Sequence, residues 1–342
     1  MQILRLDDSS RERWNTYVRR APQASFYHRA EWQTINRVSF GHTSAYLAAV
    51  REEEIVGVFP LVQLKSPVFG NIACSMPFVN YGGPCADDAG VEAALLAAAA
   101  AVTREWGSSY LEIRSRRNLG DTYPCSDHKV SLTIDLAADS EQVFNALNRN
   151  HRAEIRRAYK HGFVTKFGPE LLDDFYDVLS ESWRDLGTPI YHFDYLRSIL
   201  RTFGDDTRLC VVYDAQGVPA AGAMDGLHNG IVEGMWLGMR SEYRKQLVGY
   251  VLYWELIKDA CERGFRCFHL GRSSKDSGAE SFKKKWNAQV AQLYWHYMLH
   301  DRADLPSLNP SNPKYQLAIK VWRSLPVSVT QIVGPLVSRS IP

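Results

Sequence analysis

The sequence predicts an α/β protein built from two copies of one domain. Its 342 residues are enough for two domains of about 100–200 residues each. A content of 45% hydrophobic and 23% charged residues is typical of a globular chain rather than a disordered one. The strongest observation is an internal repeat. A hairpin, a helix, a glycine, an apolar strand and an Arg-Ser pair follow one another twice, about 160 residues apart.

The first copy begins with a hairpin at Thr43–Val62, where two apolar runs flank a charged turn. The alanine-rich segment Val91–Trp106 has a helical pattern and is followed by Gly107, a residue type favoured just after a helix. The apolar run Ser109–Ile113 then predicts a strand, which ends in Arg114-Ser115.

The second copy has these elements in the same order. Thr207–Met224 is its hairpin, and Tyr250–Arg263 is its helical segment, again followed by a glycine. Phe265–Leu270 predicts a buried strand that ends in a sharp turn at Gly271 and the pair Arg272-Ser273.

Helical patterns join the two copies. Thr133–Leu136 predicts a closing strand, Glu141–Gly162 one long helix with a glycine at its end, and Asp173–Leu186 a helix stopped by Gly187. The predicted division is an N-terminal domain over residues 1–140, a C-terminal domain over 141–300 and a tail over 301–342.

Charge and cysteine usage exclude several classes of protein. A net charge of +2 gives no global positive field, so we expect no DNA binding and expect anionic partners to be held by local patches. The six cysteines form no CxxC pair and no Cys/His ligand pattern, which argues against a metal site and suits a reducing cytosol. The N-terminus has no apolar signal segment, and the run Val91–Val102 is far shorter than the ~20 residues that span a bilayer. We therefore expect a soluble cytoplasmic protein.

The segment Phe268–Asn287 carries the clearest chemical signal. After the strand and its arginine comes a loop rich in Ser, Lys and Gly, followed by three lysines flanked by aromatic residues. An arginine at a strand end beside anchored lysines suits binding of an anion or of a developing negative charge. A solvated lysine run on a surface helix is the alternative interpretation. The residues concerned are Arg272, Phe282, Lys283, Lys284, Lys285 and Trp286.

Four cations on the predicted helix 141–162 form a second signal. Arg149, Arg152, Arg156 and Lys160 are spaced so that they lie on one stripe of the helix. Surface helices usually mix charge signs, so a stripe of one sign favours phosphate binding over an ordinary solvated face. The phosphates would belong to a tRNA end, a nucleotide-sugar or a polyprenyl-phosphate lipid.

Three turns are candidate parts of a site, each with a plain structural alternative. Arg244–Gly249 is a basic turn before a helix N-terminus, where pyrophosphate binds in several α/β folds; otherwise it is a simple loop. Gly187–His192 carries Tyr191 and His192, which either line a pocket or end a helix. Asn80–Pro84 has two glycines, which either allow close approach of a ligand or form a tight turn.

No nucleophile or nucleotide motif accompanies these turns, since GxSxG, GxGxxG and P-loop patterns are absent from the sequence. Asp225 and Glu233 are two acids that could act as a base, and each is alternatively an exposed hairpin residue.

Taken together, these motifs resemble the Fem-type (FemA/FemB-like) transferases, most of all the branch associated with PEP-CTERM and exopolysaccharide gene clusters. The resemblance covers nearly the whole chain and includes FGHTSAYLAAV, PFVNYGGP, NRNHRAEIRRAYKHG, LGTPIY and GRSSKDSGAESFKKKW. It implies two tandem GNAT-like domains, each a mixed, mostly antiparallel sheet flanked by helices, which agrees with the repeat.

The resemblance also implies an activity and a site. Better-known members of the family transfer an amino acid from aminoacyl-tRNA to an amine on a peptidoglycan precursor. A lysine that follows a phenylalanine is thought to stabilise the charge that develops, and here the implied catalytic pair is Phe282-Lys283. Two positions depart from the pattern: Asn287 stands where a glycine is common, and His269 where the branch often has an acid. The predicted substrate- or phosphate-binding residues are Arg272, Arg152, Arg156, Arg244, Tyr191, Lys284 and Trp286.

The predicted function is therefore transfer of an acyl or aminoacyl group to an amine on a cell-envelope or exopolysaccharide precursor. We expect no tightly bound cofactor and a donor that is either aminoacyl-tRNA or acyl-CoA. With acyl-CoA, the Arg244–Gly249 turn would hold the pyrophosphate. The third hypothesis is a non-catalytic GNAT-like module in polysaccharide export. Expected partners are an anionic small-molecule or lipid-linked acceptor and, for the first donor, charged tRNA.

The tail predicts contact with a membrane surface or with the N-terminal domain. Apolar residues recur at helical spacing, interrupted by Pro326 and Pro335, with Lys320, Arg323 and Arg339 among them. In the membrane case the protein would be peripheral at the inner face of the cytoplasmic membrane, near a lipid-linked acceptor. The apolar residues are Leu317, Val321, Trp322, Leu325, Val329, Ile332, Val333, Leu336 and Val337.

Overall fold

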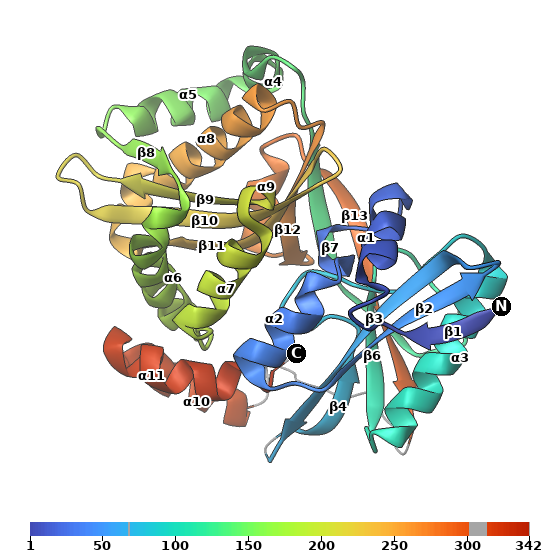
Figure 1. The fold of residues 1–342 in the computed structure, drawn as a ribbon. Coiled ribbons are helices and arrows are strands. Elements are labelled where there is room, and N and C mark those ends of the chain that lie inside the picture. The colour runs from blue at the N-terminus through green and yellow to red at the C-terminus, as the bar shows by residue number, and fades with distance from the viewer. Residues whose placement is uncertain (68, 301–312, 342) are drawn as a thin grey trace. The chain divides into compact units, whose positions relative to one another are not determined.

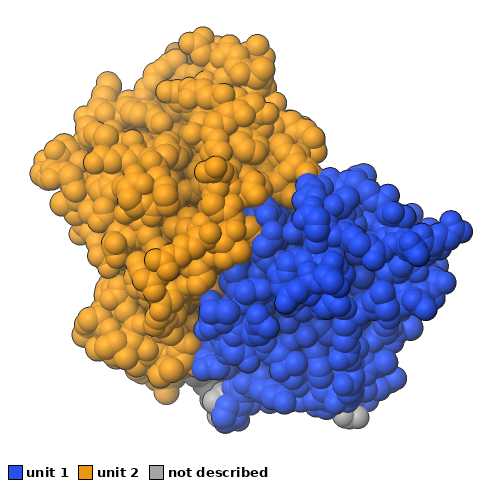
Figure 2. Space-filling model, viewed as in Figure 1, with its two compact units in different colours: residues 1–130, 292–307, 339–342 blue, residues 131–291, 308–338 orange. Residues whose placement is uncertain are grey.

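The computed structural model describes residues 1–67, 69–300 and 313–341. The chain divides into two compact units, drawn in different colours in Figure 2. Unit 1 is Met1–Val130 with the described parts of Gln292–Ser307 and Arg339–Pro342, and unit 2 is Ser131–Ala291 with the described parts of Leu308–Ser338. Two strands, β7 (Cys125–Asp135) and β13 (Gln289–Leu299), contribute residues to both units.

Unit 1 is a mixed sheet with helices on both faces. Its further elements are β1 (Gln2–Arg5), α1 (Arg11–Arg20), η1 (Phe26–His28), α2 (Glu31–Phe40), β2 (Ser44–Arg51), β3 (Glu54–Ser66), β4 (Gly70–Cys74), β5 (Cys85–Ala86), α3 (Ala89–Glu105) and β6 (Tyr110–Ser115). The strand order is β1-β2-β3-β4-β6-β13, with β4 and β6 parallel and the other neighbours antiparallel. Alternate residues of β2 serve opposite faces, since Tyr46 packs on Trp14 of α1 while Leu47 joins Leu95 of α3 in the core.

Unit 2 has the same kind of architecture. Figure 1 shows α6 and α7 on one face of its sheet and α8, backed by α5, on the other. The strand order is β7-β12-β11-β10-β9-β8, with β11 and β12 parallel. Its elements are α4 (Ser140–Ala146), α5 (Arg149–Tyr159), β8 (Val164–Phe167), η2 (Pro169–Leu171), α6 (Leu172–Leu186), α7 (Phe193–Phe203), η3 (Gly204–Asp206), β9 (Thr207–Tyr213), β10 (Pro219–His228), β11 (Ile231–Met239), η4 (Ser241–Gln246), α8 (Val248–Glu262), β12 (Cys267–Ser274), α9 (Gly278–Lys284), α10 (Pro313–Ser324) and α11 (Val327–Ser338).

The predicted duplication of an α/β domain is confirmed. Apart from the short strand β5 and the 3-10 helices, the order β1-α1-α2-β2-β3-β4-α3-β6 in unit 1 matches β8-α6-α7-β9-β10-β11-α8-β12 in unit 2. In each unit the helix before the last strand ends in a glycine with positive φ, 62° at Gly107 and 76° at Gly264. A left-handed backbone conformation has no steric penalty for glycine, so these residues end α3 and α8 and turn the chain back to the sheet.

Two predicted elements are wrong in their bounds. Glu141–Gly162 is not one helix, because Leu147 is extended and Asn148 caps a new helix by accepting a hydrogen bond from the N–H of Asn150. The strand that contains Leu270 does not end there. β12 passes through Gly271, whose φ of 73° bends the backbone, and continues to Ser274.

The described tail is divided between the units. Helices α10 and α11 belong to unit 2, where both contact α6 (Figure 1). Arg339, beyond α11, donates a hydrogen bond from Nη2 to the carbonyl oxygen of Phe40 at 2.8 Å, within unit 1. The part of the predicted tail at 301–312 lies outside the described residues.

Candidate functional site

The parallel strands β11 and β12 pair over only part of their length. Ladder pairs join Ile231–Glu233 to Cys267–His269, although both strands continue beyond these residues. The strands are still close at Gly234, the next residue, where a Cβ would lie 2.8 Å from the carbonyl oxygen of His269. The strands therefore part towards their carboxyl ends, the position where ligands bind in open α/β sheets.

Lys283 lies beside the end of β12. It belongs to α9, whose N-terminus is capped by Ser277, the hydroxyl of which accepts a hydrogen bond from the N–H of Glu280 at 3.2 Å. The Nζ of Lys283 donates to the carbonyl oxygens of Arg272 at 3.1 Å and Gly271 at 3.4 Å. Helix α9 thus holds an ammonium group against the main chain where the strands part.

This lysine is a buried cation without a carboxylate partner in the described part of the chain. Lys283 is 8% exposed. Burial lowers its pKa, and the positive charge of half-buried Arg272 lowers the pKa further, to about 8. The group is therefore still protonated at neutral pH. An ammonium has three N–H donors and two are used here, so one remains for a ligand.

Phe282 and Trp286 fix α9 on α8 through an aromatic cluster. The ring of Phe282 stands at 90° to that of Tyr250, with centroids 5.2 Å apart, and Trp286 stacks on Tyr253 at 5.8 Å. Such pairs stabilise a structure by about 0.5–1.5 kcal/mol each beyond their burial. Trp286 is completely buried. The observed contacts of both aromatic residues position Lys283, and any contact of theirs with a substrate stays a prediction.

The predicted basic turn Arg244–Gly249 lies against the same cluster. A Cβ on Gly249 would lie 2.9 Å from the sulfur of Met239 and 3.8 Å from Cζ of Phe282, so this position packs closely on β11 and α9. Arg244 is exposed at the end of η4, and the first N–H groups of α8 have no partners within the helix. The structure therefore brings together the turn, α9 and the end of β12.

Two of the predicted phosphate-binding arginines have other contacts. The Nη1 of Arg152 donates to the carbonyl oxygen of Asn145 at 2.6 Å, and the guanidinium of Arg156 lies 5.2 Å from the ring centroid of Phe144. Both partners belong to α4, which folds back on α5. Among the described residues neither arginine contacts Lys283. The stripe of cations on α5 exists, but α4 occupies part of it.

Lys284 and Tyr191 also have partners away from Lys283. Lys284 forms an ion pair with Glu280, one turn earlier on α9, at 2.5 Å. The ring of Tyr191 packs edge-on against Trp236 of β11 at 5.8 Å and is 9% exposed. Lys284 therefore lies on the solvated face of α9, and Tyr191 lies in an aromatic core on the α7 side of the sheet.

A buried ion pair at the point where the strands part was missed by the sequence analysis. The Nδ1 of His269 donates to Oε2 of Glu233 at 3.0 Å, and Glu233 is 1% exposed. Burial alone would lower the pKa of His269, but the charge of Glu233 and hydrogen bonds to Glu233 and Cys267 raise it to about 10. The alternative interpretation of Glu233 as an exposed hairpin residue is wrong. It is also wrong for Asp225, which is buried and paired with Arg208 at 2.6 Å.

His151 is a second side chain that the sequence analysis did not select. It is buried, and neither ring nitrogen has a hydrogen-bond partner among the described residues. Its ring lies 4.3 Å from that of Trp286, and burial together with Lys285 lowers the pKa of His151 to about 4. The spacing of His151, Ile155 and Ala158, all buried, was the available signal that this face of α5 points inward.

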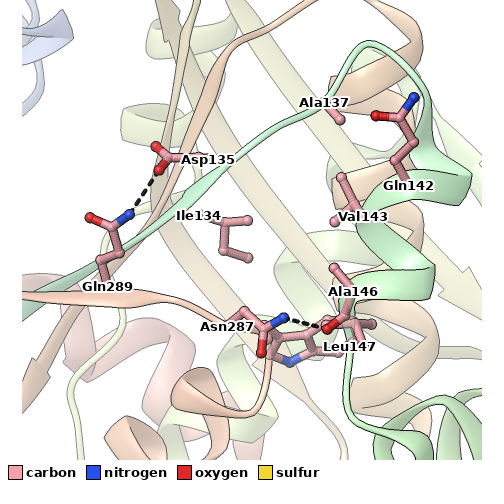
Figure 3. Close-up of a pocket in the computed structure, with 10 residues that line it drawn as sticks. Ile134, Asp135, Ala137, Gln142, Val143, Ala146, Leu147, Asn287 and Gln289 are labelled. Carbon is pink, nitrogen blue, oxygen red and sulfur yellow. Dashed lines mark hydrogen bonds between the residues drawn. The ribbon is translucent and has the colours of Figure 1, made fainter.

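A cavity of about 210 Å³ lies between α4, the end of β7 and residues 286–289 (Figure 3). On its rim Asn287 donates to the carbonyl oxygen of Ala146 at 2.9 Å, and Gln289 donates to Asp135 at 2.8 Å (Figure 3). Asn287 has a φ of 57°, a conformation that asparagine tolerates better than most residues. Asparagine at this position is thus compatible with the backbone that a glycine would adopt.

Metal-ligating side chains do not gather in the described residues: no group of three or more His, Cys, Asp or Glu could hold an ion. None of the helices in the described ranges has both the length and the apolar character that crossing a membrane requires.

Comparison with known proteins gives a domain family for part of unit 2. Residues 146–284 match the acetyltransferase (GNAT) domain family, a range that runs from the end of α4 to the end of α9 and includes Lys283. A search of curated proteins gave no match.

Solved structures give a fold for the whole chain. The crystal structure of FemX is 14% identical, with a TM-score of 0.65 over 93% of this chain and 100% of that one. The C-terminal domain of a putative lysylphosphatidylglycerol synthetase from Agrobacterium fabrum is 14% identical, with a TM-score of 0.56 over 86% and 93%. A tandem GNAT protein from the clavulanic acid biosynthesis pathway is 11% identical, with a TM-score of 0.55 over 89% and 99%. The tandem GNAT fold is therefore confirmed, and together with the family match it supports an acyltransferase.

Proposed function

We propose that this chain is an N-acyltransferase or aminoacyltransferase of the Fem type and that transfer takes place in unit 2, at the parted ends of β11 and β12. The observation that carries the proposal is the state of Lys283. Its ammonium group is buried, has no carboxylate partner in the described chain and retains one N–H donor. In a site of low dielectric, such a charge stabilises a developing anion more strongly than it would in water.

In the proposed reaction the amine nitrogen of the acceptor attacks the carbonyl carbon of the donor, and a C–N bond forms. The carbonyl oxygen becomes an oxyanion, which accepts the remaining hydrogen bond of Lys283. The C=O bond then re-forms, and the bond to the oxygen or sulfur of the donor breaks. The proton lost by the amine passes through water to the leaving group. Removing one such hydrogen-bond donor typically lowers the rate by about 10²–10³-fold.

We propose aminoacyl-tRNA as the donor and a phosphate-bearing cell-envelope or exopolysaccharide precursor as the acceptor. The likeness to FemX extends over 93% of this chain and all of that one, so both units have counterparts in a Fem-type fold. The Phe282-Lys283 pair lies where the strands part, and half-buried Arg272 beside it suits an anionic acceptor. The exopolysaccharide assignment rests on the sequence resemblance.

Acyl-CoA is the second candidate donor, and one observation favours it. The Arg244–Gly249 turn carries an exposed arginine and leads into the N-terminus of α8, where Gly249 lies close to Phe282. Helix N-termini of this kind bind pyrophosphate groups. Residues 146–284, which match the acetyltransferase domain family, include this turn.

A paired titration of the pure protein against acyl-CoA and against charged tRNA tests the choice of donor, with uncharged tRNA and Arg244→Ala as controls. We expect binding that distinguishes charged from uncharged tRNA. Saturable acyl-CoA binding that is lost in Arg244→Ala would instead assign the protein to the acyl-CoA class. Binding of neither donor would contradict both candidates and favour a non-catalytic module.

A further inference from the structure

Helix α11 is turned so that it buries its small and polar side chains and exposes its apolar ones. Thr330, Gly334 and Ser338 form the buried stripe. A Cβ on Gly334 would lie 2.9 Å from Cγ2 of Ile190, so α11 lies directly on that segment of unit 2. The Oγ of Ser338 donates to the carbonyl oxygen of Ile190 at 3.0 Å. This orientation is therefore fixed by close packing and a buried hydrogen bond.

The opposite face of α11 carries a stripe of four apolar residues, with exposed Ser328 at its edge. Val329, Ile332, Val333 and Leu336 recur at the i, i+3, i+4 and i+7 positions that form one stripe of a helix. All four are exposed, and Ile332 and Leu336 reach 72% and 67%. An amphipathic helix on a soluble protein normally places such a stripe in the core. In α11 the apolar stripe faces outward instead, and it forms a contiguous apolar surface, which is typical of an interaction site.

Helix α10 extends this surface. Leu317 and Val321 lie one turn apart and are 64% and 53% exposed. The other side of α10 is held by unit 2, because a Cβ on Gly187 would lie 2.5 Å from Ile319, and Nη2 of Arg323 donates to the carbonyl oxygen of Leu186 at 3.2 Å. Both helices therefore contact α6 or the segment after it (Figure 1). Their apolar stripes stay exposed.

The charge of this part of the sequence is of one sign. From Leu305 to Pro342 the sequence contains no Asp or Glu, and its charged residues are Lys314, Lys320, Arg323 and Arg339. The neighbouring helix supplies Asp177, which accepts a hydrogen bond from Gln331 at 3.3 Å on the α6 side. Apolar residues flanked by cations match an anionic lipid surface, where tails receive the apolar side chains and headgroups face the cations.

We propose that the exposed apolar stripes of α10 and α11 dock this protein on the surface of a membrane that contains anionic lipids. The helices lie in the interface without crossing the bilayer, and Ile332, Leu336, Leu317 and Val321 enter the boundary between headgroups and acyl chains. A second copy of the chain is a poorer match for this surface. A symmetric contact would place the same cations opposite each other with no acid in the segment to offset them.

Vesicle cosedimentation of the full chain tests the proposal, and its readout is independent of the transfer reaction. The protein should sediment with vesicles of phosphatidylcholine and phosphatidylglycerol, and less with phosphatidylcholine alone. The double variant I332D/L336D should lose at least tenfold in partitioning, because two apolar side chains become charged. Lys320→Glu should lower partitioning by about tenfold and make it less sensitive to salt.

Val38→Asp is the matched control, because Val38 is an apolar residue of α2 in unit 1 that is 69% exposed. It should partition like the wild type. Circular dichroism should show unchanged folding of every variant, since each replaced side chain is exposed. Failure of the wild type to bind anionic vesicles, or an equal loss in Val38→Asp, would overturn the proposal. So would a dimer in sedimentation equilibrium that I332D/L336D converts to monomer without any vesicle binding.

Discussion

The two units share one fold, but the opening between their two parallel strands is filled differently in each. In unit 1, β4 and β6 pair only at Ala73 with Leu111 and Cys74 with Glu112. The chain then folds back into the opening, and every residue of Ser75–Cys85 is buried. In unit 2 the connection after β11 is the helix η4, of which only Tyr243 is buried, and the opening is occupied by a side chain. The same architecture is thus closed by main chain in one copy and holds a buried ammonium group in the other.

The difference is visible at two equivalent carbonyl groups, one in each unit. At the end of β6, the carbonyl oxygen of Arg114 accepts a hydrogen bond from the N–H of Gly82 at 3.0 Å. At the end of β12, the carbonyl oxygen of Arg272 accepts one from Nζ of Lys283 at 3.1 Å. Because unit 1 satisfies this carbonyl with its own backbone and lacks a helix equivalent to α9 between β6 and β7, we assign the proposed chemistry to unit 2.

The arginines near the carboxyl ends of β6 and β12 should differ most in their effect on stability. Arg114 is completely buried, its Nε donates to Oε1 of Glu112 at 2.7 Å, and its guanidinium lies 4.5 Å from the ring of Trp295. Arg114→Met would leave Glu112 buried without its cation, so we expect a loss of about 3–5 kcal/mol in the free energy of unfolding. Arg272→Met should lose less than ~1 kcal/mol, because Arg272 is partly solvated.

Urea unfolding measures both variants under the same conditions. The double variant E112Q/R114M should recover much of the loss, because no unpaired buried charge remains. Equal stability of Arg114→Met and Arg272→Met would contradict the contrast between a locked arginine in unit 1 and an accessible one in unit 2.

Lys283→Met should separate activity from stability. Turnover should fall by about 10²–10³-fold, because the oxyanion loses its hydrogen-bond donor. Stability should rise. The lowered pKa of Lys283, about 8 instead of 10.5, destabilises the folded state by about 3 kcal/mol at any pH below 8. The penalty shrinks as the pH rises from 8 to 10.5, so the gain in Lys283→Met over the wild type should shrink over the same interval.

Transfer assays and thermal unfolding at pH 7 check this prediction. Lys258→Met is the control, since Lys258 is a half-exposed lysine on α8 whose neighbour Glu262 lies 3.8 Å away. It should change neither quantity appreciably. Near-normal turnover of Lys283→Met would remove the proposed role of this residue.

The repeat could be predicted from the sequence because its signals are local. Apolar runs, a helical period and a glycine after the helix each act over a few residues, and Gly107 and Gly264 have the positive φ that this position requires. The occupation of the opening in unit 1 could not be predicted. Whether the glycines of Asn80–Pro84 approach a ligand or the protein itself depends on β6, which lies about thirty residues further along the chain.

For the candidate site, too, the local motifs could be predicted from the sequence and the contacts between distant segments could not. The sequence places the predicted motifs at the ends of strands, so they could be expected to lie near one another. The structure brings together the Arg244–Gly249 turn, Lys283 and Arg272. The contacts of Arg152 and Arg156 with α4 arise from the break at Leu147, which converts one predicted helix into two packed ones. The spacing of the cations along one predicted helix does not show which other segment packs on them.

Substitutions of two glycines, one beside the opening in each unit, test the same contrast and should have smaller effects on stability. Gly82→Ala would place a Cβ 2.5 Å from Cβ of Met76 and 2.8 Å from the carbonyl oxygen of Ser75, so we expect a loss of about 1–3 kcal/mol in stability. In Gly249→Ala the new Cβ would lie 2.9 Å from the flexible end of Met239, so the stability of this variant should fall less.

Thermal unfolding and the KM for the donor distinguish the two variants. Gly249→Ala should raise KM several-fold, and Gly82→Ala should leave KM unchanged while folded. A raised KM in Gly82→Ala alone would place ligand binding in unit 1.

The smallest expected effect concerns the pH dependence of transfer. The wild-type rate should fall as the pH rises through about 8, because Lys283 then loses the proton and the positive charge that stabilise the oxyanion. Burial sets most of this lowered pKa, and the charge of Arg272 contributes the rest. Arg272→Gln should therefore raise the pKa of Lys283 and move the alkaline limb to higher pH by up to about one unit, whereas Arg272→Lys should keep it in place. An acceptor amine gains reactivity as it loses its proton, so it cannot produce a falling alkaline limb. Identical limbs in the wild type and in Arg272→Gln would mean that the titrating group is not the lysine beside Arg272, and the chemistry would then have to be sought elsewhere in unit 2.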